Sequence, residues 1–296
     1  MNLQSKITTA VLMSLGLTLS ACQKQQQEMP AASQPAEASA PVAPKKASFS
    51  ADIQPVNVQL PKCEGNSCPE FQVQRLKSNA EAINKQIDQA ILATLKENLD
   101  LSDQPASELS ASQPVVTSQN SDEFTQAVTA YANNFMQLDQ QLKKMGANPQ
   151  ISLHIQPKVL PSPNGVVTIQ LNSDNFLGGA HGAASQQYFV FDAVHHKHLK
   201  LDDVLLKQQR PALEKLAYQQ FQQWVMTQKL ADNVKNYEQA WPFKLTNNFY
   251  FDDKGLNLQY GEYEIGPYVV GMPTFTLSYA QLNGIVKPQY LPKTAQ

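Results

Sequence analysis

Apolar residues recur at helical spacing in two stretches of the chain. Ile83, Ile87, Ile91 and Leu95 follow one another four residues apart and predict a helix over residues 79–97. A second run starts near Asp122 and alternates steps of four and three, with Phe124, Val128, Tyr131, Phe135, Leu138, Leu142 and Met145 as its apolar members. Gly146 and Pro149 then end it. Three heptads are marginal for a coiled coil, so we expect this helix to pack on a sheet.

The period changes to two from residue 151 onward. Ile151, Leu153 and Ile155 alternate with polar neighbours, and the turn Asn164-Gly165 leads into a return strand at residues 167–171. Further strands are predicted at residues 71–75, 185–192, 249–251, 256–260 and 275–279, and a third helix at residues 211–229. Hairpins joined to inserted helices predict an α+β fold with a largely antiparallel sheet and packed helices.

The first residues have the pattern of a secretory signal. Lys6 precedes a short apolar stretch, and Leu19-Ser20-Ala21-Cys22 follows. This tetrapeptide resembles a bacterial lipobox, which implies removal of residues 1–21 and attachment of fatty acyl chains such as palmitate to Cys22. Gln23 stands where inner-membrane lipoproteins usually carry Asp. By that rule, we expect an outer-membrane lipoprotein that faces the periplasm of a Gram-negative cell, with the membrane contacted through its lipid anchor.

Composition divides the remainder of the chain. Residues 22–54 are rich in Pro, Ala, Ser and Gln, which predicts a disordered tether, with a removed pro-peptide as the alternative. We expect two modules after it, at residues 55–150 and 151–296. The chain has 23 basic and 25 acidic residues, and this balance argues against nucleic acid as a partner.

Three cysteines are too few for a disulfide scaffold. With Cys22 assigned to lipid, Cys63 and Cys68 form an even pair in an oxidising compartment, which predicts a disulfide. A redox pair or a metal pair is the alternative. However, the four intervening residues do not match the redox motif, and the chain has no second cysteine pair to complete a zinc site.

Several segments resemble one family. The segment Asn175–Gly182 contains Gly-Gly-Ala-His, which is similar to the signature of the RsiV-like domain, also called DUF3298. Residues 188–205 and 249–282 resemble later blocks of that family, and residues 69–95 resemble the DUF4163 module that often precedes it. The resemblance implies an extracytoplasmic α+β sensor or binding domain.

The best-known member of that family is a transmembrane anti-sigma factor whose outer domain binds lysozyme, and other members are fused to peptidoglycan deacetylases. This chain departs from both, because its first segment reads as a signal peptide and we find no deacetylase domain. We therefore expect no sigma factor as a partner and no deacetylation. The function that the resemblance still implies is recognition of a lysozyme-like protein or a peptidoglycan fragment.

Enzymatic signatures are weak in this sequence. It contains no Gly-x-Ser-x-Gly, P-loop, His-Glu-x-x-His or Rossmann motif. His195, His196 and His198 are expected in a solvated turn, so we predict neither a metal site nor a cofactor. Glu262 and Glu264 are expected about 6.6 Å apart on one face of a strand, where a carboxylate pair could serve glycoside hydrolysis. We expect a structural role for this pair and no catalysis.

The glycine-rich loop is the strongest candidate for a ligand site. Glycines allow close backbone approach and positive φ, and a histidine can donate, accept or titrate. The alternative is a tight turn with a satisfied histidine. The candidate ligand-binding residues are Gly178, Gly179, His181, Glu262, Tyr263 and Tyr268. The rival function is an enzyme that acts on an envelope polymer; a cleft with His181, Glu262 and Glu264 together would favour it.

Overall fold

The computed structural model describes residues 48–99, 122–147, 149–163 and 165–292. The predicted signal peptide, Cys22 and most of the predicted tether lie outside these ranges. The described residues belong to one compact unit. Within them, no helix combines the length and the apolar character needed to cross a membrane.

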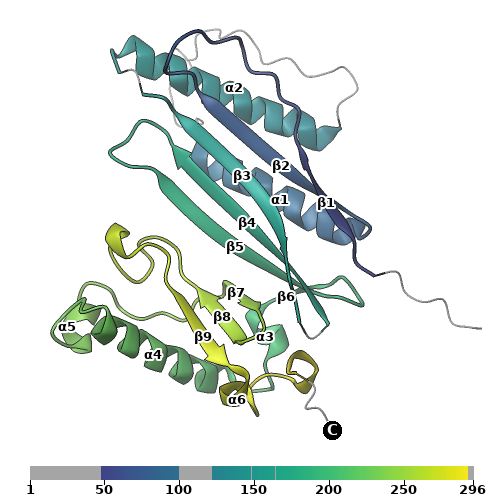
Figure 1. Ribbon diagram of the computed structural model, residues 1–296, viewed down its shortest axis with the longest axis vertical. Helices are drawn as coiled ribbons and strands as arrows, with labels where there is room; N and C mark the ends of the chain where they lie inside the picture. Colours follow the sequence, from purple (N-terminus) through teal and green to yellow (C-terminus); the bar gives the residue numbers. More distant parts are fainter. Residues whose placement is uncertain (1–47, 100–121, 148, 164, 293–296) are drawn as a thin grey trace, which may run out of the picture. The chain divides into compact units, whose positions relative to one another are not determined.

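A six-stranded sheet dominates the first two thirds of the described chain (Figure 1). Its strands lie in chain order: β1 (Ala51–Pro55), β2 (Glu70–Ser78), β3 (Ser152–Leu160), β4 (Val166–Phe176), β5 (Ala183–Asp192) and β6 (His198–Leu199). Neighbouring strands are antiparallel except β2 and β3, which are parallel. The α+β class and the largely antiparallel sheet are therefore confirmed.

Two long helices, α1 (Glu81–Leu99) and α2 (Glu123–Lys144), cover one face of this sheet, which we call the covered face (Figure 1). The predicted stripe of α1 is fully buried there, from Ile83 to Leu95. It packs with Leu153 of β3 and Ile169 of β4 in one aliphatic core. Burial of such side chains stabilises by roughly 1.5–3 kcal/mol each, so this stripe fixes α1 on the sheet.

Polar side chains hold the starts of both helices. Asp122 caps α2 by accepting from the backbone N–H of Thr125 at 3.0 Å, as expected for a helix that starts there. Arg75 of β2 binds Asp88 of α1 and Asp122 together, which ties the sheet to both helices. At the start of α1, the buried Asn84 side chain accepts from the backbone N–H of Ser78 and donates to its carbonyl.

The last third of the chain forms a smaller layered module (Figure 1). Its elements are α3 (Leu201–Val204), α4 (Arg210–Thr227), α5 (Val234–Glu238), β7 (Phe249–Phe251), β8 (Gly255–Gln259), the 3-10 helix η1 (Tyr268–Val270), β9 (Thr274–Ser278), α6 (Tyr279–Leu282) and η2 (Pro288–Tyr290). β7, β8 and β9 form an antiparallel sheet against which α4 packs. Unlike the aliphatic core under α1, this core is rich in aromatic rings, with Phe221 at its centre.

Two boundaries differ from the sequence prediction. Residues 51–54 were assigned to the tether, and this is wrong, because they form most of β1 and pair with β2. The boundary expected at residue 150 does not separate two sheets, because β2 pairs with β3 across it. Both errors share one cause: the pairing partners lie far apart in the sequence, and local patterns carry no signal of them.

The smaller module covers the outer edge of β5. Asn248 accepts from the backbone N–H of Tyr188 at 2.8 Å and donates to the carbonyl of Gln186 at 2.7 Å. Glu262 accepts from the backbone N–H of Ala184 at 3.3 Å. Side chains thus satisfy an edge that would otherwise present unpaired backbone groups.

The predicted disulfide between Cys63 and Cys68 is present, with the two Cα atoms 5.7 Å apart. It closes the connection between β1 and β2. Pro61, Lys62 and Cys63 of this connection line a shallow hollow with Met136 and Asp139 of α2. The disulfide therefore constrains a segment that lies beside α2.

Candidate functional site

The glycine-rich segment is the hairpin loop between β4 and β5. Gly178 has φ +90, and a Cβ built there would lie 2.9 Å from a methyl carbon of Leu142 on α2. Glycine is therefore required by both the backbone conformation and the close approach of the helix. Gly178 is constrained by this packing although it is exposed, and Gly179, Ala180 and His181 are exposed as well.

His181 is held by three contacts. Its Nδ1 lies 2.8 Å from the carbonyl oxygen of Gly182, which can only accept, so this contact assigns the hydrogen to Nδ1. In the neutral ring, Nε2 then accepts from the hydroxyl of Tyr263 at 3.2 Å. The ring also stacks on Tyr268, with centroids 4.1 Å apart. The predicted loop histidine therefore meets the two predicted tyrosines, although they lie about 80 residues later.

The tyrosines belong to a loop that joins β8 to β9, and its backbone is constrained. Tyr263 has φ +61, a left-handed conformation that costs a residue with a Cβ about 1–2 kcal/mol. Tyr237 of α5 holds the loop in place, because its hydroxyl donates a hydrogen bond to the carbonyl of Ile265 at 3.0 Å. A Cβ on Gly266 would lie 2.6 Å from that same hydroxyl, so the loop packs closely on α5.

Glu262 and Glu264 do not share a strand face, and that prediction is wrong. β8 ends at Gln259, and residues 262–264 form a turn. Glu264 accepts from the backbone N–H of Gly261 at 2.8 Å and so closes the turn. Glu262 points the other way, toward β5. The alternation of Tyr and Glu that resembled a strand is produced by this turn.

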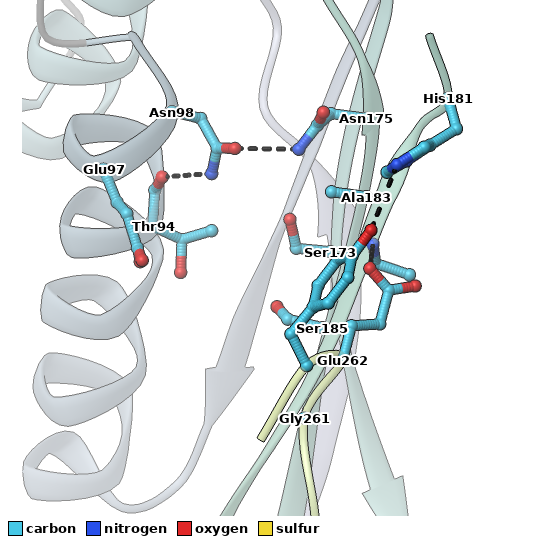
Figure 2. A pocket seen from close by; sticks show the side chains of 12 residues that line it. Thr94, Glu97, Asn98, Ser173, Asn175, His181, Ala183, Ser185, Gly261 and Glu262 are labelled. Carbon is cyan, nitrogen blue, oxygen red and sulfur yellow. Dashed lines mark hydrogen bonds between the residues drawn. The ribbon is translucent and has the colours of Figure 1, made fainter. Parts of the chain in front are cut away.

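A pocket of about 340 Å³ lies between the C-terminal end of α1, the β4–β5 hairpin and the 261–263 turn. Thr94, Glu97 and Asn98 of α1 form one side of it, and Figure 2 shows Asn98 pointing toward the strands. The full lining is Thr94, Glu97, Asn98, Ser173, Asn175, His181, Ala183, Ala184, Ser185, Gly261, Glu262 and Tyr263. The lining carries hydroxyls, amides and two carboxylates but no Lys or Arg, so it suits a ligand group that donates hydrogen bonds.

Part of this lining is fixed before any ligand binds. Asn175 of β4 donates to the side-chain oxygen of Asn98 at 2.8 Å, and Asn98 donates to the carbonyl of Thr94 at 2.8 Å. This chain of hydrogen bonds joins the end of α1 to the sheet (Figure 2). The remaining polar groups face the pocket on a rigid frame, and preformed sites of this size are typical of small ligands or single side chains.

The sequence predicted the loop residues that line this pocket but not the residues contributed by α1 and β4. The structure brings His181, Glu262, Tyr263 and Tyr268 together as a cluster, whereas it gives Gly178 to packing. The residues on α1 and β4 were missed. One signal was available: along β4, the side chains on the covered face change from apolar, at residues 167, 169 and 171, to Ser173 and Asn175.

The expectation of three histidines in a solvated turn is wrong for His198: His195 and His196 precede β6, whereas His198 is its first residue. His195 lies 3.0 Å from Asp192 within the turn, whereas His198 is half-buried against Phe189 and Phe191. Burial lowers the pKa of His198, so its ring is mostly neutral at pH 7. Within the described ranges, no group of three His, Cys, Asp or Glu residues is placed to hold a metal ion.

Known proteins resemble this chain in both sequence and fold. Residues 202–280 match the family described as "Protein of unknown function (DUF3298)". The match includes the 261–271 loop of the site. None of the curated proteins matches this chain.

Two solved structures of DUF3298 proteins share the fold. One, from Pseudomonas aeruginosa PAO1, has 27% sequence identity and a TM-score of 0.55, and the alignment covers 83% of this chain and 96% of that one. The other, from Bacteroides fragilis NCTC 9343, has 17% identity and a TM-score of 0.53, with 81% and 94% covered. The DUF3298 part of the predicted resemblance is therefore confirmed, whereas the RsiV-like and DUF4163 parts stay predictions.

Proposed function

We propose that this chain is a cell-envelope lipoprotein whose extracytoplasmic domain binds a ligand in the pocket beside His181 and catalyses no reaction. The ligand is a lysozyme-like protein or a peptidoglycan fragment. The observation that carries the proposal is the pocket itself, because a preformed polar cavity joins the α1 end to the loop with the Gly-Gly-Ala-His signature.

The charge of the pocket supports this choice of ligand. Glu97 and Glu262 both line it, and no Lys or Arg does. A phosphate or carboxylate group would meet repulsion there, whereas an ammonium, a guanidinium or a hydroxyl would find acceptors. A basic side chain at the surface of a lysozyme-like protein, or the amino and hydroxyl groups of a wall fragment, fits this requirement.

The exposed rim supports contact with a macromolecule. The loop between β8 and β9 exposes the large side chains of Tyr263, Tyr268 and Val269. Of these, Val269 is 88% exposed. Aromatic side chains supply large contact areas at interfaces with little loss of conformational entropy. The strained conformation of Tyr263 is a further sign of function, since such strain persists where the surrounding structure enforces it.

The rival function is an enzyme that acts on an envelope polymer. One observation favours it: the pocket holds His181 together with Glu262 and Glu97. Against it, Glu264 is used within its own turn, and Glu262 is engaged with the backbone of β5. The cleft expected for an enzyme, with His181, Glu262 and Glu264 together, is therefore incomplete, because Glu264 does not line the pocket.

Calorimetric binding tests the proposal. The full chain is titrated with a lysozyme and, separately, with soluble muropeptides, and His181→Ala is expected to weaken binding by about 1–3 kcal/mol. Because His181 is exposed, its loss should leave the melting temperature nearly unchanged. An unstable variant with undiminished affinity would defeat the site, and a wild type that binds neither ligand would defeat the ligand assignment. Product formation from muropeptides would favour the enzyme.

The anchor is tested separately. Cys22→Ser should give a protein without acyl chains, because the cysteine thiol is the atom that accepts the lipid. Mass spectrometry of the exported wild type should show the modified cysteine at the new N-terminus. An unmodified mature protein would remove the lipoprotein part of the proposal and leave the pocket untouched.

A further inference from the structure

Two hydroxyl groups that the fold leaves unpaired line the pocket beside His181. Ser173 of β4 pairs directly with Ser185 of β5, and Figure 2 shows both residues across from Thr94 of α1. Ser173 is only 6% exposed, yet neither its hydroxyl nor that of Ser185 makes a hydrogen bond to any residue in the described ranges. A buried hydroxyl without a partner is costly. The partner of Ser173 must therefore come from the pocket itself.

Two carboxylates reach the pocket from separate elements. Glu97 belongs to the last turn of α1, and Glu262 belongs to the turn that follows β8. The Glu262 side chain accepts from the backbone N–H of Ala184. The Glu97 side chain makes no hydrogen bond within the part of the chain that the structure describes. Among the described residues, no Lys or Arg forms an ion pair with either carboxylate. The lining therefore carries negative charge that the protein does not compensate.

This uncompensated charge selects the charge of the ligand. A ligand that fills the pocket displaces water from both carboxylates, and an uncharged ligand recovers only part of that cost. A cation is attracted by both carboxylates, whereas an anion is repelled by both. Charges closer than the Debye length of about 8 Å are only partly screened, so both carboxylates act on a charge inside the pocket.

The arrangement of acceptors favours an ammonium over a guanidinium. A guanidinium holds its donors in one plane and binds best to both oxygens of a single carboxylate. The hydroxyls of Ser173 and Ser185 offer one oxygen each, and one oxygen of Glu262 already accepts from the backbone. Only Glu97 offers a free pair of oxygens. An ammonium directs three donors away from one another, which suits single acceptors on different elements.

An aromatic ring completes the match to a cation on a carbon chain. Tyr263 lines the pocket, and its hydroxyl is already engaged with His181 at 3.2 Å. The face of an aromatic ring attracts positive charge and also packs against methylene groups. Ala183 and Ala184 add apolar surface to the same lining. The pocket thus offers partners both for a charged nitrogen and for the carbon atoms that carry it.

We propose that the pocket beside His181 recognises a protonated primary amine, which donates to the hydroxyls of Ser173 and Ser185 and is neutralised by Glu97 and Glu262. The inference rests on the proposed function and deepens it, because it names the group by which the ligand enters the pocket. The amine belongs to a lysine side chain of a lysozyme-like protein or to an amino group of a peptidoglycan fragment. Both sources present the same ammonium at physiological pH.

Two small probes test the charge requirement. The labelled full chain is titrated with Nα-acetyl-lysine amide and with the same compound acetylated at Nε, and amide chemical shifts give the dissociation constants. The lysine probe should shift resonances of residues 173, 185 and 262 and bind at least tenfold more tightly than its acetylated form. Absence of binding, shifts at other residues only, or equal affinity of the two probes would overturn the inference. An arginine probe that binds as tightly as the lysine probe would overturn the choice of ammonium.

Variants of matched size test the residues. Glu97→Gln/Glu262→Gln keeps hydrogen-bond acceptors while it removes both charges, and it should weaken binding of the lysine probe tenfold or more. Ser173→Ala should weaken binding severalfold without lowering the melting temperature, because the hydroxyl has no described protein partner to lose. Glu64→Gln/Glu214→Gln removes two exposed carboxylates elsewhere and should leave the affinity unchanged. Equal losses in the two double variants would contradict the assignment.

Acetylation of the larger ligands identifies the source of the amine. A lysozyme with acetylated lysines and muropeptides with acetylated amino groups are each compared with the unmodified ligand, and the source is the ligand whose affinity falls tenfold or more. If an unmodified ligand binds and loses nothing on acetylation, the inference fails while the proposed function stands. If the lysine probe binds while neither unmodified ligand does, the ammonium site stands and the proposed ligands are wrong.

Discussion

The two faces of the six-stranded sheet differ in how far their side chains are buried. The covered face is filled by the aliphatic stripe of α1 and its neighbours on β3 and β4, and most of its side chains are fully buried. The opposite face of the sheet, which we call the open face, carries the exposed side chains of Gln156 and Lys158 on β3 and Asp174 on β4. We therefore expect substitutions of the buried residues on the covered face to cost far more than substitutions of the exposed residues on the open face.

The pocket beside His181 lies where the covered face changes character. Apolar residues line that face until Leu171, and Ser173 and Asn175 follow on the same side of β4. α1 changes in the same region, from Ile91 and Leu95 to the polar lining residues of its last turns. A buried face that turns polar at one end leaves a cavity that water or a ligand must fill, because polar groups without partners are costly there.

The largest expected effect is on the covered face. Ile87 is fully buried in the stripe of α1, so Ile87→Ala should lower the free energy of unfolding by about 2–5 kcal/mol through lost burial and a residual cavity. Urea-induced unfolding followed by far-ultraviolet circular dichroism measures this. A loss below about 1 kcal/mol would mean that α1 is not packed on the sheet as described.

The disulfide should have the next largest effect. Cys63→Ser/Cys68→Ser should lower the free energy of unfolding by about 2 kcal/mol, because the short loop regains entropy in the unfolded chain. The same denaturation experiment on reduced and oxidised wild type serves as the control. If reduction leaves the unfolding midpoint unchanged, the cross-link does not stabilise the fold through the segment beside α2.

A smaller, pH-dependent effect is expected where Arg75 joins β2 to the helices. Arg75 holds the pKa of Asp122 well below its usual range, so the ionised carboxylate stabilises the fold above about pH 4. This contribution is lost as the pH falls toward the lowered pKa. Asp122→Asn should cost about 0.5–1 kcal/mol at pH 7, and the difference from wild type should shrink in acid.

The exposed Asp232→Asn is the matched control for that titration. Its stability should follow the wild type across the same pH range. Parallel curves for wild type and Asp122→Asn down to pH 2 would show that the ion pair does not couple the sheet to α2.

The smallest stability effect is expected on the open face. Gln156 is exposed and unpaired within the described ranges, so Gln156→Ala should change the free energy of unfolding by less than about 0.5 kcal/mol. The same urea titration as for Ile87→Ala gives the direct comparison. A cost above about 1 kcal/mol would contradict the contrast between the faces, because it would give this face a structural role.

Local periodicity predicted much of the fold because it records burial directly. The stripe of α1 and the alternation in β3 are read from residues a few positions apart, and the observed helix boundaries differ from the predicted ones by about two residues. β1 was missed because a five-residue edge strand with mostly exposed side chains leaves no such alternation. Its existence depends on pairing with β2, across the disulfide loop.

The site was predictable on one side only. Glycines around His181 indicate a loop with special backbone geometry, and the family resemblance pointed to Tyr263 and Tyr268. Glu97 gave no signal, because an acidic residue in the exposed part of a helix is ordinary. Its place in the pocket follows from the packing of α1 on β4, which is set by contacts distant in sequence.

The central claim is that ligand binds in the pocket beside His181, and amide chemical-shift mapping tests it most directly. The labelled full chain is titrated with a lysozyme and, separately, with soluble muropeptides. The account predicts that at least one of them shifts resonances concentrated at residues 94–98, 173–175, 181–185 and 261–263. Shifts confined to other surfaces, or the absence of shifts with both ligands, would contradict it.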